Sequence, residues 1–474
     1  MSAPPSGDAV DGPVVETPSG ALRGRRRGDV LEFRGVPYAR AERFGEPGPV
    51  PPWEGTRDAT VHGAISPQLP SRLGPVTGRP DDGDLTADED CLNVVVRAPA
   101  APAERPRPVV VWFHGGAYIG GAGSLPWYDT ERLVREGDVV TVSVNYRLGI
   151  LGWLRLPGVS PGNLGLLDLL AALRWVHGHV AAFGGDPDDV TVIGQSAGAH
   201  ALACLMGRPE TGPLLRRAVL QSGQFGLAPL STARADTVAG YVTDALDGDP
   251  TSVPVADLLE AQRRAMVRAA GPGGANSAPA FAPVAGIAPL GPAGYPVWDV
   301  TASGHDVLVG STADEAETFV RISPGLDRIR RFPLVGRPLT AVGSALVTRR
   351  VFTAPALRIA DDAARAGSRV WTYSFDWRAP RNDLGACHCI ELPFLFGTAA
   401  AWSGAPMLAG STWAEDVEPL AAALRAAWLR FVHDGDPGWS PHRAGAGPGI
   451  RLRDAGTLDE AVEPEPSAGG HPWP

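Results

Sequence analysis

The sequence predicts an α/β fold in which helices cover both faces of a mostly parallel sheet. Short runs rich in Val, Ile and Leu recur along the chain, and continuous apolar runs are typical of strands buried on both faces. Helix-like segments alternate with these runs, and the one at 164–182 has a broad apolar face. This alternation favours a parallel sheet. The predicted strands are 109–113, 139–145, 190–193, 218–221, 307–309 and 370–375.

Four stretches rich in Pro and Gly interrupt this pattern, at 43–57, 66–84, 269–298 and 440–450. Predicted strands of one sheet lie on both sides of the middle stretches, so we interpret all four as cap-like loop excursions. The resulting expectation is a single domain over 13–454, preceded by a disordered lead at 1–12 and followed by a flexible tail at 455–474.

Composition excludes several classes of function. The net charge of −10 comes without a basic patch, which argues against a nucleic-acid partner. The chain has no lysine, so a phosphate-binding loop, a Schiff base and Ser-x-x-Lys chemistry are all excluded. Cys387 and Cys389 flank His388, but the chain has no Cys-x-x-Cys pair, and we expect neither a metal nor a cofactor.

The N-terminus has neither the cationic start nor the apolar stretch of a secretory signal. The longest apolar runs have the length of a strand, far short of a membrane span. We therefore expect a cytoplasmic protein with no membrane partner, present as a monomer or a weak homo-oligomer.

The strand at 190–193 leads into the pentapeptide Gly194, Gln195, Ser196, Ala197, Gly198, and a helix-compatible segment follows at 199–206. Gly-x-Ser-x-Gly between a strand and a helix is typical of the nucleophile turn of α/β-hydrolases. Side chains two positions either side of the serine would collide in so sharp a turn, which explains both glycines. Ser196 is the predicted nucleophile.

A second loop follows the strand at 109–113 and reads His-Gly-Gly-Ala-Tyr at 114–118. Backbone N–H groups of a closely approaching loop can stabilise the oxyanion of a tetrahedral intermediate, and small residues permit that approach. We predict oxyanion donors at Gly116, Ala117 and Ala197, the last directly after the nucleophile.

A serine nucleophile needs a histidine base, and the histidine needs a carboxylate that orients it. In α/β-hydrolases the chain order is Ser, acid, His. The strand at 307–309 leads to two adjacent candidates for the acid, Asp314 and Glu315, which this reasoning leaves open. His388 lies in the loop after the strand at 370–375 and is the predicted base.

Taken with their surroundings, these motifs resemble the type B carboxylesterase family, which includes cholinesterases and bacterial para-nitrobenzyl esterases. Further blocks that carry the resemblance lie at 33–39, 89–93, 145–149, 162–168, 183–187, 313–315 and 385–394. The resemblance implies an α/β-hydrolase fold and ester hydrolysis through an acyl-enzyme intermediate. It also implies a Ser-His-Glu triad, which selects Glu315 over Asp314 and supports His388.

The chain also departs from the family pattern. Gln195 stands where the family usually has glutamate, which implies a preference for neutral, hydrophobic esters over cationic ones. Ser66 replaces a cysteine that in many relatives bridges to the equivalent of Cys91, so this disulfide cannot form. The remaining alternatives are a binding protein on the same fold, and an amidase, lactonase, carbamate hydrolase or acyl transferase with the same triad.

Overall fold

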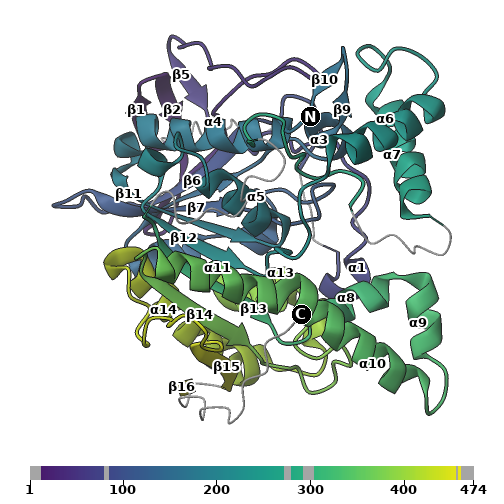
Figure 1. The fold of residues 1–474 in the computed structure, drawn as a ribbon. Coiled ribbons are helices and arrows are strands. Elements are labelled where there is room, and N and C mark those ends of the chain that lie inside the picture. The colour runs from purple at the N-terminus through teal and green to yellow at the C-terminus, as the bar shows by residue number, and fades with distance from the viewer. Residues whose placement is uncertain (1–11, 80–84, 272–278, 292–303, 455–456, 461–474) are drawn as a thin grey trace, which may run out of the picture.

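The computed structural model describes residues 12–79, 85–271, 279–291, 304–454 and 457–460. A large sheet runs through the molecule, with helices on both of its faces (Figure 1). The strand order in this sheet is β16-β15-β14-β13-β12-β11-β7-β8-β6-β4-β3. The predicted fold class is confirmed.

The middle of the sheet is parallel and contains all six predicted strands. They are β7 (Arg107–Phe113), β8 (Val140–Val144), β11 (Gly185–Gln195), β12 (Arg217–Gln221), β13 (Asp306–Thr312) and β14 (Val370–Phe375). Each strand pairs in parallel with its neighbours in the order β14-β13-β12-β11-β7-β8. Their carboxyl ends therefore meet at one edge of the sheet, where loops after different strands come close together.

Alternate residues of a central strand enter opposite cores, as the two-residue period of a strand requires. Val109 and Val111 of β7 lie in one core with α4 (Leu164–His179), α5 (Ala197–Met206) and α11 (Ala354–Arg365). Val110 and Trp112 face the other core, which α14 (Glu418–Asp434) covers. Burial on both faces is the reason that these strands are apolar without interruption.

Helix α4 continues into a short 3₁₀ helix at Val180–Phe183. Within the described part of the chain, the stretch Leu164–Phe183 is the one helix long and apolar enough to cross a membrane. Its apolar side chains, among them Leu169, Leu173 and Val176, are buried in the core of this domain. The length and composition of this stretch therefore reflect its central place in the fold.

Antiparallel strands at both edges extend the sheet beyond the prediction. On one side β8 pairs with β6 (Asn93–Pro99), which pairs with β4 (Val30–Pro37) and through it with β3 (Arg25–Arg27). On the other side β15 (Ile450–Asp454) pairs in parallel with β14, and only the outermost strand β16 (Thr457–Glu460) is antiparallel to its neighbour β15. We expected the domain to end at Asp454, but pairing continues to Glu460. Residues 1–11, most of the predicted lead, and 461–474, most of the predicted tail, lie outside the described residues.

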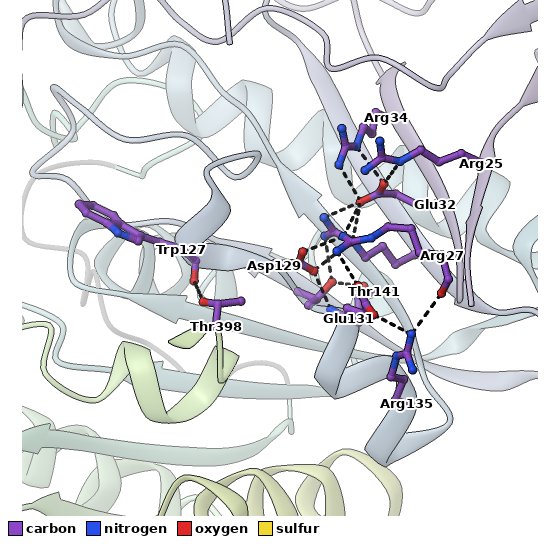
Figure 2. Close-up of polar contacts among 12 residues, drawn as sticks. Arg25, Arg27, Glu32, Arg34, Trp127, Asp129, Glu131, Arg135, Thr141 and Thr398 are labelled. Carbon is purple, nitrogen blue, oxygen red and sulfur yellow. Dashed lines mark hydrogen bonds and ion pairs between the residues drawn. The ribbon is translucent and has the colours of Figure 1, made fainter. Parts of the chain in front are cut away.

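A buried carboxylate ties the β3–β4–β6 edge together (Figure 2). The fully buried Glu32 of β4 forms ion pairs with Arg25, Arg34 and Arg97, the last at 2.7 Å. Burial opposes ionisation of Glu32, but the positive charges of Arg97, Arg34 and Arg25 outweigh it and lower the pKa of this carboxyl to about 2. Breaking such a pair leaves an uncompensated buried charge, which is strongly destabilising.

Candidate active site

Ser196 lies at the turn between β11 and α5, at the carboxyl edge of the sheet. Its φ of 54° and ψ of −122° place it outside the regions that non-glycine residues ordinarily adopt. Its N–H donates to the carbonyl of Gln221 on the adjacent β12, and its own carbonyl accepts from His200 N–H in α5. These bonds hold the strained backbone in place and match the predicted nucleophile turn.

The two glycines of the pentapeptide are required by close backbone packing. A Cβ on Gly194 would lie 2.7 Å from backbone atoms of Gly198 and Ala199. A Cβ on Gly198 would lie 2.1 Å from the carbonyl oxygen of Phe113, at the end of β7. The steric reason inferred from the sequence is therefore found in the structure.

His388 lies between Ser196 and Glu315. Its Nε2 is 2.8 Å from Ser196 Oγ, and its Nδ1 bonds to Glu315 Oε2. The second oxygen of Glu315 accepts from Thr312 N–H at 2.9 Å, which fixes the carboxylate. All three side chains are buried, and Ser196 is 7% exposed. The structure thus brings the three predicted residues into one hydrogen-bonded chain.

Asp314, the alternative acid, faces away from His388. Its Oδ2 accepts from Ala386 N–H at 2.8 Å, and its N–H donates to the Ala386 carbonyl. It also pairs with the exposed Arg378 at 2.9 Å. Asp314 therefore joins the loop after β13 to the loop that carries His388, which is a structural role.

The neighbours of His388 shift the pKa of its imidazole. Burial opposes its protonation, but the Cys389 sulfur and the Glu315 carboxylate outweigh burial and raise the pKa of the imidazole well above its ordinary value. A protonated His388 cannot accept the Ser196 proton. Chemistry that uses His388 as a base is therefore lost as the pH falls through this raised pKa.

The predicted oxyanion loop lies directly beside the nucleophile. A Cβ on Gly115 would lie 3.0 Å from Ser196 Cβ, so this backbone is as close as packing allows. The loop adopts positive φ at Gly116 and at Ala117, and Gly116 has no room for a Cβ because Gly120 O would lie 1.9 Å away. Among the described residues, none accepts a hydrogen bond from the N–H of Gly116, Ala117 or Ala197.

Sequence reasoning missed a second buried carboxyl group near the triad. Glu391 Oε1 accepts from Ser222 Oγ at 3.1 Å. Burial and the negative charge of Glu315 raise the pKa of Glu391 to about 7. Ser222 directly follows β12, whose carboxyl end lies beside that of β11. Its position at the end of a predicted strand was the signal in the sequence that could have placed it near Ser196. In the sequence, Glu391 belongs to the block at 385–394 that carries the family resemblance, and no role was predicted for it.

Aromatic side chains divide into two groups. Tyr118, Trp127 and Trp153 are all buried, and Tyr118 packs against Trp153 with ring centroids 4.3 Å apart. Phe319 and Phe352, which were not predicted, pack against the ring of His388. Their ring centroids lie 5.4 and 5.5 Å from that of His388.

A strained serine at a strand–helix turn, with a histidine and a carboxylate from later strands, places the chain among the α/β-hydrolases. A family model described as "Carboxylesterase family" matches residues 11–325 and 340–445. The chain belongs to this family, and the resemblance to type B carboxylesterases is confirmed. It is a carboxylic ester hydrolase.

Individual relatives agree with this assignment. A protein of Rhodococcus erythropolis named "Probable N-octanoylanthranilate hydrolase" is 42% identical over 438 residues, 91% of this chain and 95% of that protein. The para-nitrobenzyl esterase of Bacillus subtilis is 34% identical over 461 residues, 90% of each chain. The crystal structure of a Geobacillus stearothermophilus carboxylesterase at pH 6.2 has a TM-score of 0.79 and 32% identity, and it covers 94% of this chain and 98% of its own.

Proposed function

We propose that this protein hydrolyses neutral, hydrophobic carboxylic esters through an acyl-enzyme intermediate, with Ser196, His388 and Glu315 as its triad. The observation that carries the proposal is the contact of 2.8 Å between Ser196 Oγ and His388 Nε2, with Glu315 on the opposite ring nitrogen. A nucleophile, a base and an orienting acid in this order are what serine catalysis requires.

In the first half-reaction, Ser196 Oγ attacks the carbonyl carbon of the ester while His388 Nε2 takes the hydroxyl proton. Collapse of the tetrahedral intermediate breaks the bond to the alcohol oxygen, and His388 returns the proton to this leaving group. In the second half-reaction, His388 takes a proton from water, and the resulting hydroxide attacks the acyl-enzyme. The acid leaves and Ser196 regains its proton.

The oxyanion of each tetrahedral intermediate would accept hydrogen bonds from Gly116, Ala117 and Ala197. Their N–H groups are candidates because no described residue accepts from them, and because the loop at 115–117 contacts the nucleophile turn. Removing a donor of this kind typically raises the barrier by about 2.7–4 kcal/mol.

The preference for neutral substrates rests on Gln195. This side chain is 1% exposed and donates from Nε2 to Cys389 Sγ at 3.6 Å, next to the triad. An amide at this position brings no charge to attract a cation. Phe319 and Phe352 beside His388 provide apolar surface for a hydrophobic acyl or alcohol group.

The cysteines support the proposed cytoplasmic location. Ser66 and Cys91 lie close enough to hydrogen-bond, as expected for the place of the missing bridge. All four cysteines are buried and free. A protein without disulfides suits a reducing compartment.

A second candidate function comes from the R. erythropolis relative, whose name gives an N-acyl arylamine as substrate. Cleavage of an N-octanoyl bond follows the same acyl-enzyme route, with an aromatic amine as leaving group in place of an alcohol. The identity of 42% over 95% of that protein favours testing this alternative.

The proposal predicts the ranking of a substrate panel. A 3,3-dimethylbutyl ester, the neutral isostere of a choline ester, is expected to give a higher kcat/KM than the choline ester of equal acyl chain, because Gln195 supplies no anionic charge. Para-nitrophenyl butanoate and octanoate report the preference for acyl-chain length. N-octanoylanthranilate, an aryl carbamate and a thioester complete the panel, which is measured by initial rates. A kcat/KM for N-octanoylanthranilate above that of every ester would replace the ester proposal with the amide one.

Glu315→Gln is expected to lower kcat at least on the order of 10²-fold, since the amide cannot stabilise the imidazolium or hold its tautomer. Removing this charge also lowers the pKa of His388, so the acid limb of the kcat/KM profile should move to lower pH. The pH–rate profiles of wild type and variant measure both effects.

The matched control for this variant is Asp314→Asn, an isosteric change in the neighbouring residue. Asparagine can still accept from Ala386 N–H, so activity should stay close to that of wild type. A fully active Glu315→Gln together with an impaired Asp314→Asn would assign the acid to Asp314.

A further inference from the structure

Helix α10 (Gly336–Val347) has the reverse of the usual distribution of residues, because its large apolar side chains are exposed and its small or polar ones are buried. The residues facing the protein are small or polar, namely Gly336, Thr340 and Ser344. The opposite face presents large apolar side chains with exposed fractions of 59–73%, namely Val335, Leu339, Val342 and Leu346. Their spacing of four, three and four residues forms one continuous stripe on the helix. Surface helices of globular proteins place such a stripe toward the core instead.

The segment before α10 extends this apolar surface. Helix α9 (Pro324–Arg330) exposes Leu326 and Ile329, and the connection to α10 exposes Phe332 at 60% and Leu334 at 96%. Figure 1 shows α9 and α10 projecting together from the side of the molecule, away from the central sheet. We call the exposed apolar residues of 326–347 the α9–α10 surface. A contiguous apolar patch of this kind marks an interaction site.

The charge around the α9–α10 surface is opposite to that of the whole protein. Residues 321–350 contain seven arginines and one aspartate, a formal charge of +6 within a chain of net charge −10. Asp383, from outside this segment, pairs with two of these arginines, Arg330 and Arg337. Three exposed arginines, Arg328, Arg349 and Arg350, form no ion pair with any described residue. Arg349 and Arg350 lie one turn beyond Leu346, at the end of the apolar stripe. Apolar residues flanked by unpaired arginines are typical of helices that lie on anionic membrane surfaces.

Part of the α9–α10 surface lies outside the match to the carboxylesterase family model. The match is interrupted from 326 to 339, which spans most of α9 and the start of α10, and it resumes at residue 340. The exposed residues Ile329, Phe332, Leu334, Val335 and Leu339 therefore lie outside the matched scaffold, whereas Val342 and Leu346 lie within it.

We propose that the α9–α10 surface docks the enzyme on an anionic lipid bilayer, with the apolar stripe in the headgroup region and the arginines on lipid phosphates. This departs from our expectation of no membrane partner. That expectation considered spanning segments, and a helix that lies on a surface needs none.

The position of the surface relates docking to catalysis. Phe319 on α8 (Glu315–Ile322) is 37% exposed, and its ring lies 5.4 Å from that of His388. Helix α8 begins with Glu315 and leads directly into α9. A bilayer on the α9–α10 surface would therefore lie near the partly exposed Phe319, which packs beside His388. If the proposed function holds, docked enzyme would receive esters that partition into lipid.

A second copy of the chain is a less suitable occupant. Pairing two α9–α10 surfaces would bring the arginines Arg328, Arg349 and Arg350 of both copies together, which opposes association. An anionic bilayer instead offers an apolar region for the exposed apolar side chains and phosphates for the arginines.

The test is co-flotation of purified protein with vesicles of ether-linked phosphatidylcholine, with and without ether-linked phosphatidylglycerol. Ether lipids contain no ester bond, so binding is measured independently of hydrolysis. We expect binding to the anionic vesicles that weakens with added salt, and little binding to phosphatidylcholine alone. Val342→Asp combined with Leu346→Asp should abolish binding. Arg349→Gln with Arg350→Gln should weaken partitioning about 25-fold, at about fivefold per arginine.

Val267→Asp is the matched control, because Val267 is a 65% exposed valine on the distant helix α7 (Val255–Ala270). It should bind anionic vesicles like wild type. Circular dichroism and melting temperature establish that each variant is folded. Equal binding of wild type and Val342→Asp/Leu346→Asp would overturn the proposal. A second result would also overturn it: light scattering shows that the wild type is a dimer and the double variant a monomer, while the wild type binds no vesicles.

Discussion

Ser196→Ala is expected to lower kcat for a para-nitrophenyl ester by on the order of 10⁴-fold or more. The reason is that the covalent route needs the Oγ that contacts His388 Nε2 at 2.8 Å, and alanine supplies no nucleophile. Residual hydrolysis would come from binding and from the oxyanion donors alone. Initial rates at equal concentrations of folded protein measure the effect.

Covalent labelling makes this first prediction specific to one side chain. An organophosphate should add one adduct per wild-type chain, at Ser196, and none to Ser196→Ala, as read by mass spectrometry of the peptides. The exposed Ser403→Ala is the control and should label and turn over like wild type. An adduct on another serine, or turnover that survives in Ser196→Ala, would move the nucleophile elsewhere.

His388→Ala should reduce kcat by a similar factor, on the order of 10⁴ or more, because members of a triad act as a unit. The variant leaves Ser196 without a base and Glu315 without its partner. The remaining rate should lose the acid limb that the wild-type pH profile owes to His388. Stopped assays across pH measure both features.

Added imidazole separates a lost base from a damaged fold. It should restore part of the His388→Ala rate, since the vacated space lies between Ser196, Glu315, Phe319 and Phe352. His177→Ala on the exposed side of α4 should behave like wild type with or without imidazole. Full activity in His388→Ala would require a different base.

The centre of the fold was predictable because its strands are buried on both faces. Such strands have no polar face, so their apolar runs are visible in the sequence without knowledge of their partners. The strand β4 was not predicted, because a buried charge, Glu32, interrupts its apolar residues. Only arginines from other positions make that carboxylate tolerable, and sequence spacing does not reveal these contacts.

The site was predictable where one local motif defines a conformation. The nucleophile turn needs two glycines around a serine, and the structure has this geometry at Ser196. Asp314 and Glu315 could not be separated from the residues alone, since both follow β13 and a single step along the chain determines which of them faces His388. Ser222 and Glu391 meet only because β12 lies beside β11.

The arginine-bound carboxylate of Glu32 and the imidazole of His388 give the enzyme two separate responses to acid. Glu32 has its pKa lowered to about 2, so its stabilising contribution is complete above the ordinary glutamate range and is lost as the pH falls toward that value. His388 has a raised pKa, so it becomes protonated at much higher pH. Mild acid should therefore inactivate the enzyme while it remains folded, and only strong acid should protonate Glu32 and destabilise the β3–β4–β6 edge of the sheet.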